Sequence, residues 1–305
     1  MKRIFLIVLW LIPFSLFSQQ INVVSFNIRY GTAPDGENSW PNRIEMVNGL
    51  LRFHDADIFG LQEALYQQIL DIENGLPGFG WFGIGRDDGD KAGELTPIFY
   101  NKSKFKLLDH GNFWLSETPE KPSKSWDAAL NRIVTWGKFE SAETGKQFVF
   151  FNTHFDHRGV EARKNSAELI WKKIQEITQN KDIPVLVTGD FNLSPDSEPI
   201  LLLKKHLRDS FEVSEEPAYG PVGTFQAFKI DAELTSKARI DYVFVNNKVD
   251  VLKYAALSDF KDHRFPSDHL PVFAKVRFGN VNLVTLLCYS QKNVFSMQFH
   301  HNFAP

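Results

Sequence analysis

The sequence predicts a single large domain in which β-strands and α-helices follow one another along the chain. Three observations favour this class of fold. Short apolar runs recur, segments with helical spacing of apolar residues separate them, and no repeat or linker rich in Pro, Gly or Ser divides the chain. The 305 residues include 28 Phe and 7 Trp, enough to fill a sizeable core, so the composition excludes disordered and fibrous proteins.

The expected strands are short, apolar and rich in β-branched or aromatic residues, which is typical of buried strands. They lie at residues 21–28, 58–61, 97–100, 133–139, 148–154, 184–188, 239–245 and 271–278. Residues 75–93 are rich in Gly and Asp and are expected to form a loop.

Helices are expected where apolar residues recur every three or four positions. This spacing occurs around residues 44–51, around Leu65 and Ile69, and most clearly over residues 160–179. The predicted domain covers residues 21–278, and residues 279–305 form a C-terminal tail to which the sequence assigns no role.

Residues 1–18 have the anatomy of a secretory signal peptide. A cationic start, Lys2 and Arg3, precedes an apolar run over residues 4–16, and small and polar residues follow. The run is shorter than the roughly 20 residues that a transmembrane helix needs. We therefore expect a secreted or periplasmic protein, whose formal net charge changes from −3 to −5 when cleavage removes Lys2 and Arg3.

Charge and cysteine content exclude several kinds of function. A net charge of −3 argues against a strongly basic protein that coats nucleic acid, but it allows an enzyme that binds a few phosphates. Cys288 is the single cysteine, so the chain has no intramolecular disulfide and no zinc cluster built on cysteine.

Carboxylate, amide and imidazole side chains collect at the ends of the expected strands. Burying such groups costs free energy unless a cation or hydrogen bonds compensate, so we expect one convergent polar site. Oxygen ligands without cysteine favour a hard divalent cation, Mg²⁺ or Mn²⁺. The residues are Asn27, Glu63, His154, Asp190, Asn192, Asp241, Asp268 and His269.

Each of these segments also has a purely structural explanation. Asp190 and Asn192 fit a turn in which their side chains bond to their own backbone. Asp241 fits an ion pair with Arg239 on an edge strand. The occurrence of all the segments together, in this order, favours the functional interpretation.

Seven segments carry a resemblance to a known family: Ser-Phe-Asn27, Leu-Gln-Glu63, Phe-Tyr100, Asn-Thr-His154, Gly-Asp190-Phe-Asn192, Arg-Ile-Asp241-Tyr and Ser-Asp268-His269. In this order they resemble the endonuclease/exonuclease/phosphatase superfamily of metal-dependent phosphohydrolases, over residues 21–278. The resemblance implies an α+β fold, a four-layer sandwich of two packed β-sheets flanked by helices, with the site at one end. The chain looks most like secreted bacterial members that carry only the core domain.

The resemblance also implies a metal site. Glu63 is the carboxylate expected to hold Mg²⁺ or Mn²⁺, with Asn27 beside it. Asp268 is expected to add a ligand or to contact one.

The catalytic roles follow from the same resemblance. Asp190 is expected to activate the attacking water and Asn192 to position it. His154 and His269 are expected to donate to the phosphoryl oxygens, and Asp241 to hold His269 in one tautomer.

Three further residues are expected to contact the substrate. The resemblance implies a hydrogen bond from Tyr100 to the phosphate or the scissile oxygen. Arg132, just before an expected strand, is placed to clamp a phosphate or to form a surface ion pair. Arg29 is expected either to contact the same substrate or to lie at the rim of the site.

These features predict a secreted Mg²⁺- or Mn²⁺-dependent hydrolase of phosphate esters, either a phosphodiesterase or a phosphatase. The alternatives are a nuclease on DNA or RNA, including a 3′–5′ exonuclease, and a non-catalytic metal- or phosphate-binding module. The substrate is a phosphorylated small molecule, a lipid head group or a nucleic acid, and a long basic run that would favour the last is absent from the sequence. We expect a monomer without a stable protein partner.

The signal peptide is directly testable. We expect the mature protein to begin near Gln19 or Gln20 and to accumulate outside the cytoplasm, because residues 1–18 are cleaved on export. Intact-mass measurement on protein secreted by a bacterial host checks this. A mature chain that still begins at Met1 would contradict it.

Overall fold

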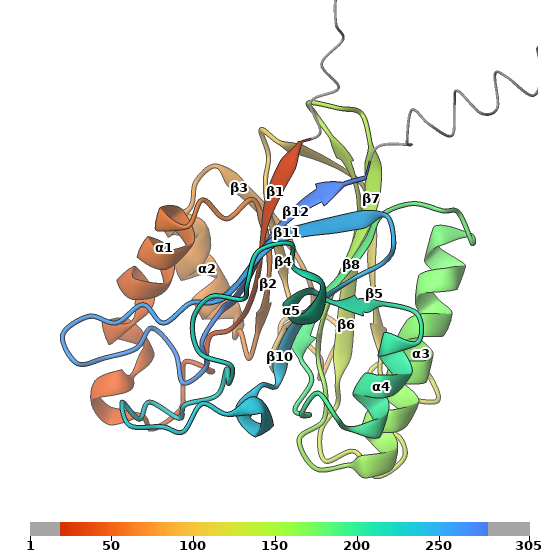
Figure 1. Cartoon of the computed structure of the whole chain (residues 1–305). Helices are drawn as coiled ribbons and strands as arrows, with labels where there is room; N and C mark the ends of the chain where they lie inside the picture. The colour runs from red at the N-terminus through yellow and green to blue at the C-terminus, as the bar shows by residue number, and fades with distance from the viewer. Residues whose placement is uncertain (1–18, 280–305) are drawn as a thin grey trace, which may run out of the picture.

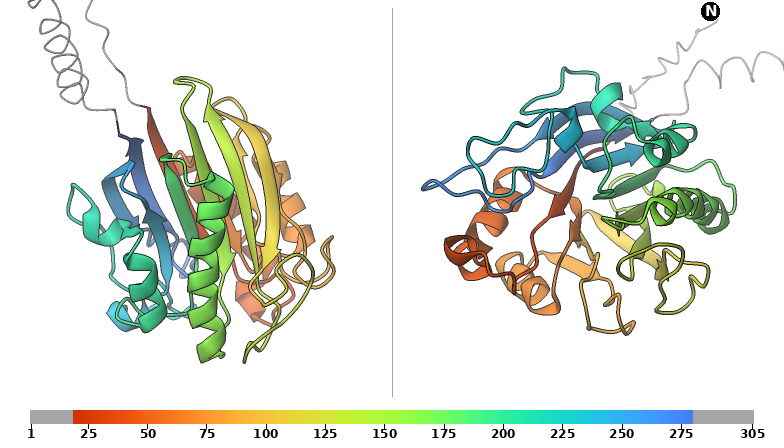
Figure 2. Two further views of the ribbon diagram at one scale, coloured as in Figure 1. Left: turned by 90° about the vertical axis from the view of Figure 1, so that its right-hand side faces the viewer. Right: turned by 90° about the horizontal axis from the view of Figure 1, so that it is seen from below.

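Two six-stranded β-sheets pack face to face, and helices cover the outer face of each sheet (Figures 1 and 2). The structure is a computed structural model that describes residues 19–279. The predicted four-layer α+β sandwich is confirmed. The predicted signal peptide and residues 280–305 of the predicted tail lie outside the described residues.

The first sheet has the strand order β11-β12-β1-β2-β4-β3, in which only β1 and β2 run parallel. Its strands are β1 (Gln20–Asn27), β2 (Ile58–Gln62), β3 (Phe79–Phe82), β4 (Ile98–Asn101), β11 (Val249–Ala256) and β12 (Val272–Phe278). The loop predicted over residues 75–93 is therefore partly wrong, because β3 pairs with β4 along the edge of the sheet. β3 is aromatic but only four residues long, and glycines surround it, so the surrounding pattern indicated a loop.

The second sheet has the strand order β5-β6-β7-β8-β10-β9, in which only β7 and β8 run parallel. Its strands are β5 (Phe105–Trp114), β6 (Ile133–Ser141), β7 (Gln147–His154), β8 (Val185–Asp190), β9 (Arg208–Asp209) and β10 (Asp241–Val245). The sequence did not predict β5, β9 or β11.

The helices divide between the two outer faces. They are α1 (Ile44–Phe53) and α2 (Tyr66–Gly75) on the first sheet, and α3 (Val160–Thr178) and α4 (Glu198–Lys204) on the second, with a short α5 (Ser210–Val213). Short 3₁₀ helices cover Gly36–Asn38, Trp40–Asn42 and Ser236–Ala238. Within residues 19–279, no helix has the length and apolar character needed to span a membrane.

Alternation along β1 explains why the core has layers. Ile21 and Val23 lie in the apolar cluster between the two sheets, whereas Val24 and Phe26 lie in the cluster beneath α1 and α2. Successive side chains of a strand point to opposite faces, so a strand that is apolar at every position suits a sheet covered on both faces.

The space between the sheets becomes polar toward one end. The Asn152 amide nitrogen on β7 donates to the carbonyls of Leu61 and Pro97, at 2.7 and 3.0 Å. The Asn152 amide oxygen accepts from Gln62 Nε2 at 2.6 Å and from Thr188 Oγ1 at 3.0 Å. The bonds with Leu61, Pro97 and Gln62 cross from one sheet to the other, so they fix how the two layers lie relative to each other at this end.

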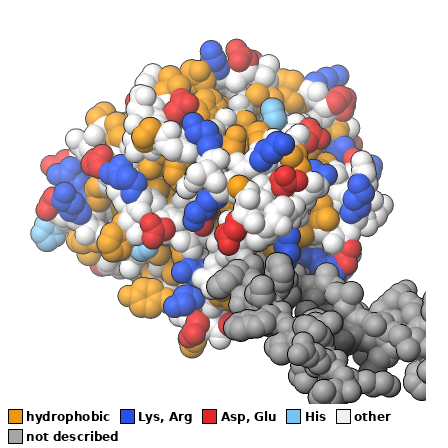
Figure 3. Space-filling model, turned by 90° about the horizontal axis from the view of Figure 1, so that it is seen from above, with side chains coloured by type: hydrophobic (Ala, Val, Ile, Leu, Met, Phe, Trp, Pro, Cys, Tyr) orange, Lys and Arg blue, Asp and Glu red, His pale blue; other side chains and the backbone are white. Residues whose placement is uncertain are grey.

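Figure 3 shows the end of the molecule at which the described chain starts and finishes. Acidic and basic side chains are interspersed over this end. The strands that carry the candidate site residues run toward the other end.

The close approach of the two sheets predicts the effect of one substitution. A Cβ on Gly60 would lie 2.3 Å from Asn152 Cγ and 2.5 Å from Thr188 Oγ1, so Gly60→Ala forces the layers apart. We expect a loss of about 1–3 kcal/mol of folding free energy, seen as a lower melting temperature. The control is Gly49→Ala in α1, where no atom lies within 4 Å of the added Cβ and alanine favours the helix. Equal melting temperatures for Gly60→Ala and wild type would contradict the argument.

Candidate active site

The ends of two parallel strand pairs, β1 with β2 and β7 with β8, and the start of a fifth strand bring the candidate residues together. Asn27 is the last residue of β1, and Glu63 directly follows β2. His154 ends β7 and Asp190 ends β8. Asp241 begins the antiparallel β10, and Asp190 is in register with His154 on one side and Asp241 on the other. The strand ends predicted from the sequence therefore meet at one end of the sandwich.

Asn27 joins the two halves of this site. Its amide nitrogen donates to Asp190 Oδ2 at 2.9 Å, across the two sheets, and to Glu63 Oε1 at 3.2 Å. Its amide oxygen accepts from the backbone N–H of Arg29 at 3.0 Å. Asn27 is completely buried, so its side chain has one orientation available to it.

Glu63 and Asp268 form an acidic pair of side chains beside Asn27. Glu63 has a left-handed backbone, with φ of 57°, and its Oε2 accepts from the Tyr30 N–H at 3.1 Å. Burial raises the pKa of the Asp268 carboxyl, and the charge of His269 opposes the shift. Two carboxylates and an amide oxygen are the ligand types that hard divalent cations prefer, so this set fits the predicted metal.

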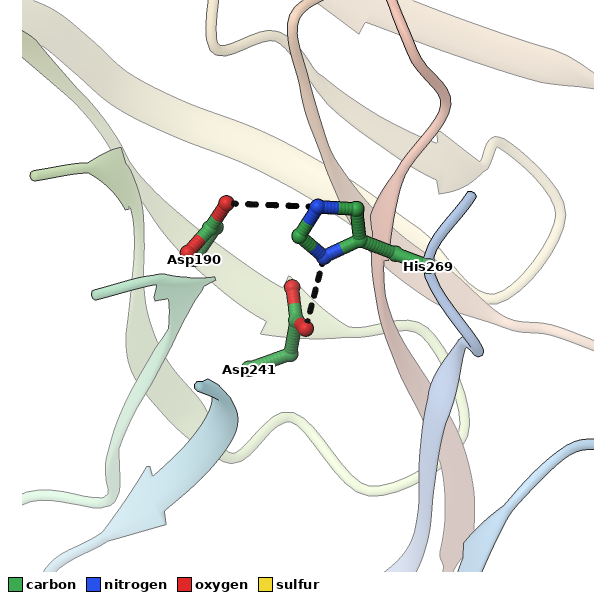
Figure 4. A group of neighbouring side chains, drawn as sticks. All are labelled: Asp190, Asp241 and His269. Carbon is green, nitrogen blue, oxygen red and sulfur yellow. Dashed lines mark hydrogen bonds and ion pairs between the residues drawn. The ribbon is translucent and has the colours of Figure 1, made fainter. Parts of the chain in front are cut away.

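His269 and Asp241 form a buried pair, shown in Figure 4. His269 Nδ1 donates to Asp241 Oδ2 at 2.9 Å, and Thr224 Oγ1 donates to the same oxygen at 2.6 Å. Burial lowers the pKa of His269, but the charge and hydrogen bond of Asp241, together with the charges of Asp190 and Asp268, outweigh burial and raise that pKa well above the ordinary value. The ring is therefore protonated at neutral pH, and its Nε2 lies 3.8 Å from Asp190 Oδ2.

The structural alternative for Asp241, an ion pair with Arg239, is wrong. Arg239 Nη1 instead lies 2.8 Å from Asp209 Oδ2, and both side chains are buried. Asp241 has its side chain at the site.

His154 is in the opposite protonation state. Burial, helped by the positive charge of Arg132, lowers its pKa to about 3, so the ring is neutral. The Asn192 amide nitrogen donates to the Phe155 carbonyl at 3.1 Å, which turns the same nitrogen toward His154 Nε2, also at 3.1 Å. His154 Nε2 is thus an acceptor from Asn192. His154 therefore orients Asn192, and its Nδ1–H, which has no hydrogen-bond partner among the described residues, is the atom left for the predicted donation to a phosphoryl oxygen.

The alternative explanation of Arg132, a surface ion pair, is wrong because the side chain is buried, whereas its contact with a phosphate stays a prediction. Arg132 is buried beside His154, with Nε 3.7 Å from Asp156 Oδ2 and Nη1 3.9 Å from Glu94 Oε2. Arg86 Nη1 donates to the same Glu94 oxygen at 2.7 Å. Burial, together with the charge of Arg86, lowers the pKa of Arg132. Arg132 therefore contributes positive charge close to the site.

Arg29 lies among carboxylates. Its Nε and Nη2 donate to the two oxygens of Asp35, at 3.0 and 3.1 Å. The guanidinium also lies 3.8 Å from Asp268 Oδ2 and 4.0 Å from Glu63 Oε2. The Asp35 hydrogen bonds raise the pKa of Arg29, against the opposing effect of burial.

The prediction that Tyr100 contacts the phosphate is wrong. Tyr100 on β4 pairs with Ile58, the first residue of β2, whereas Glu63 follows the last residue of that strand. Five residues of strand at about 3.3 Å each separate the two levels by roughly 16 Å. The Tyr100 ring packs instead against Phe82 and Phe139 between the sheets.

Four further residues lie at the site and were not among those predicted from the sequence. Glu94 and Arg86 bond to each other and lie at or next to the loop expected over residues 75–93. Only this position near a loop indicated that they could reach the site. Thr224, which bonds Asp241, and Asp35, which holds Arg29, lie in irregular segments without a pattern of their own.

Comparison with known proteins identifies the family. The model of the Endonuclease/Exonuclease/phosphatase family matches residues 24–269. The chain belongs to this family. An endonuclease/exonuclease/phosphatase family protein from Bacteroides thetaiotaomicron is 38% identical, with a TM-score of 0.83 over 86% of this chain and 96% of that one. A mannosyl-6-phosphatase from the same organism is 39% identical, with a TM-score of 0.81 over 85% of this chain and 100% of that one.

Curated relatives of the endonuclease/exonuclease/phosphatase family include nucleases. The CCR4-Not complex 3′-5′-exoribonuclease subunit Ccr4 of Aspergillus niger is 24% identical over 85% of this chain and 52% of that protein. The chain therefore spans about half the length of that relative. Members of the family are metal-dependent phosphoester hydrolases, so the protein is an enzyme of this class and not a non-catalytic binding module.

The Asp241–His269 pair yields a kinetic prediction. Asp241→Asn removes the charge that keeps His269 protonated, so we expect kcat to fall about 10²–10⁴-fold. Metal affinity should stay nearly unchanged, because Glu63 and Asn27 are untouched, whereas Glu63→Ala should be partly rescued by excess metal. The double variant Asp241→Asn with His269→Ala should be little worse than His269→Ala alone, because paired residues act as a unit.

The measurements are kcat, metal dependence and melting temperature on the same preparations. If Asp241→Asn lowers only the melting temperature and leaves kcat of the folded protein at the wild-type value, Asp241 has a structural role and the prediction is wrong.

Proposed function

We propose that the protein is a Mg²⁺- or Mn²⁺-dependent phosphatase that removes phosphate from a phosphorylated sugar. One observation carries the choice of substrate. Identity with the mannosyl-6-phosphatase is 39% and extends over all of that chain, whereas identity with the exoribonuclease is 24% over half of it. On the pattern of residues 1–18, we further propose that the enzyme acts outside the cytoplasm.

Two groups of side chains are candidates for binding the metal. Asp190, Asp241 and His269 place ligand atoms within 4.8 Å of one another. However, His269 Nδ1 and Thr224 already occupy Asp241 Oδ2. We assign the ion to Glu63, with Asn27 and Asp268 beside it, because the cationic ring of His269, bonded to Asp241, repels a metal ion from the other group. When bound, the ion neutralises charge on the phosphoryl group and polarises it.

The residues of the second sheet then carry the proton transfer. Burial, reinforced by the charge of Asp241, raises the pKa of Asp190, which makes this carboxylate a stronger base toward an attacking water. Asn192 is fixed beside it, because its backbone N–H donates to Asp190 Oδ1 at 2.9 Å and its amide is held by His154. Asn192 therefore positions the water that Asp190 deprotonates.

His269 supplies positive charge to the developing phosphoryl oxygens. The ring is fixed by Asp241 on one nitrogen, so Nε2–H is the donor that remains. Positioned donors and cations are sufficient for phosphoryl transfer, and the site needs no covalent nucleophile.

A panel assay tests the substrate. Purified protein with Mg²⁺ should release phosphate from mannose 6-phosphate or a mannosyl 6-phosphate glycan faster than it hydrolyses the other members of the panel. These are bis-p-nitrophenyl phosphate, single-stranded RNA and DNA, sphingomyelin and inositol phosphates. The Asp190→Asn variant is the control for contaminating activity. Stepwise shortening of RNA without release of phosphate from the sugars would overturn the proposal in favour of an exonuclease.

Metal removal tests the cofactor. EDTA should abolish turnover and added Mg²⁺ or Mn²⁺ should restore it, because the acidic site cannot otherwise accommodate an anionic phosphate. The rate of the same preparation is measured before chelation, after chelation and after each metal is added. Full activity in metal-free buffer is incompatible with this mechanism.

A further inference from the structure

We propose that Arg29 is a fixed positive charge that limits the catalytic centre to one divalent ion and tempers its affinity for that ion. The inference rests on the metal assignment made above, in which Glu63 and Asp268 lie at the metal. It gives Arg29 a role different from a contact with substrate phosphate.

The first observation is where the guanidinium lies. It is 3.8 Å from Asp268 Oδ2 and 4.0 Å from Glu63 Oε2, which is close enough for strong attraction but too long for a hydrogen bond to either. The guanidinium instead donates short hydrogen bonds to Asp35, at 3.0 and 3.1 Å. Asp35 therefore keeps Arg29 next to the two carboxylates without letting it occupy their oxygens.

The second observation is that hydrogen bonds hold the backbone of Arg29 in a left-handed conformation at this position. Its φ of 58° is a left-handed conformation that costs a side-chain-bearing residue free energy, so surrounding bonds must impose it. The N–H of Arg29 donates to Asn27 Oδ1 at 3.0 Å, and its carbonyl accepts from Gln68 Nε2 at 2.9 Å. Arg43, a fully buried guanidinium, donates to the Ile28 carbonyl immediately before it.

The third observation concerns charge. Three carboxylates, those of Asp35, Glu63 and Asp268, lie within 4.0 Å of the guanidinium. One divalent ion together with Arg29 balances these three negative charges. A second ion would have to lie close to both cations, with no further carboxylate of this group to compensate it.

The other group of acidic side chains is less suited to a second ion, because most of its oxygens accept hydrogen bonds and only Asp241 Oδ1 lacks a partner among the described residues. Asp241 Oδ2 is bonded to His269 and Thr224. Asp190 Oδ2 accepts from Asn27, and Asp190 Oδ1 accepts from the Asn192 N–H. The cationic ring of His269, bonded to Asp241, repels a second ion on this side, and Arg29 repels it on the other, so both favour a single ion.

Manganese binding tests the inference without measuring activity. The full processed chain should bind one Mn²⁺ in isothermal titration calorimetry and give the electron paramagnetic resonance spectrum of an isolated ion. Arg29→Gln should bind Mn²⁺ roughly tenfold to a hundredfold more tightly, because a unit charge about 4 Å from the ligands is removed. Arg29→Lys, which keeps the charge, should remain close to wild type.

Two further variants complete the design. Asp35→Asn frees the guanidinium to bond Glu63 and Asp268 directly, so it should weaken Mn²⁺ binding. Arg52→Gln is the matched control, because it removes an arginine charge that is paired with Glu45 on α1. Its dissociation constant should equal that of wild type. Melting temperatures without metal identify any variant that fails to fold, and Arg29→Lys and Asp35→Asn then still decide the question.

The outcomes separate the inference from the function on which it rests. A wild-type chain that binds no divalent ion refutes the proposed function itself. A single bound ion whose affinity is the same or weaker in Arg29→Gln overturns only the role of Arg29. Coupled Mn²⁺ pairs in wild type overturn it as well. So does an Arg29→Gln variant that raises KM for the substrate with unchanged Mn²⁺ affinity, since that result assigns Arg29 to the phosphate.

Discussion

The hydrogen bond from Asn27 to Asp190 joins the two sheets at the end where the catalytic groups lie. Asn27 ends a strand of one sheet, and Asp190 ends a strand of the other. The carboxylates that we propose bind the metal and the proposed general base therefore belong to different layers, and their separation depends on how the layers pack. Displacements of about 1 Å can cost a hundredfold in rate, so this contact must be rigid. The buried bonds of Asn152, which lie between the same layers, provide that rigidity.

Strained backbone at the strand ends is the second constraint. Arg29, Glu63 and Asn192 each follow a strand by one or two residues, and their φ angles are 58°, 57° and 53°. Such conformations cost of order 1–3 kcal/mol for residues with side chains. Each is held by a bond within the site, such as the one from the Asn192 N–H to Asp190. These conformations therefore lower the stability of the fold, and in return they direct side chains into the site directly after a strand.

The sequence predicted the fold class and the strand ends that carry the site, because buried strands leave long apolar runs and polar residues stand out where the runs stop. It could not predict where strands lie relative to one another. Tyr100 follows an apolar run as Asn27 does, but its strand is antiparallel to β2 and carries it away from the site. Similarly, the sequence placed Arg29 on substrate or rim, because nothing in it shows that Glu63 and Asp268 converge on that arginine.

The two histidines show that burial alone does not determine their chemistry. His154 and His269 are both almost fully buried and lie 3.4 and 3.8 Å from the same Asp190 oxygen. Burial lowers the pKa of each, yet only His154 ends up neutral. The difference comes from the nearest charges, since His269 is bonded to Asp241 whereas His154 is beside Arg132. One histidine is thereby left as a cationic donor, and the other as an acceptor that orients Asn192. The two histidines have opposite roles because the negative charge of Asp241 lies beside His269, whereas the positive charge of Arg132 lies beside His154.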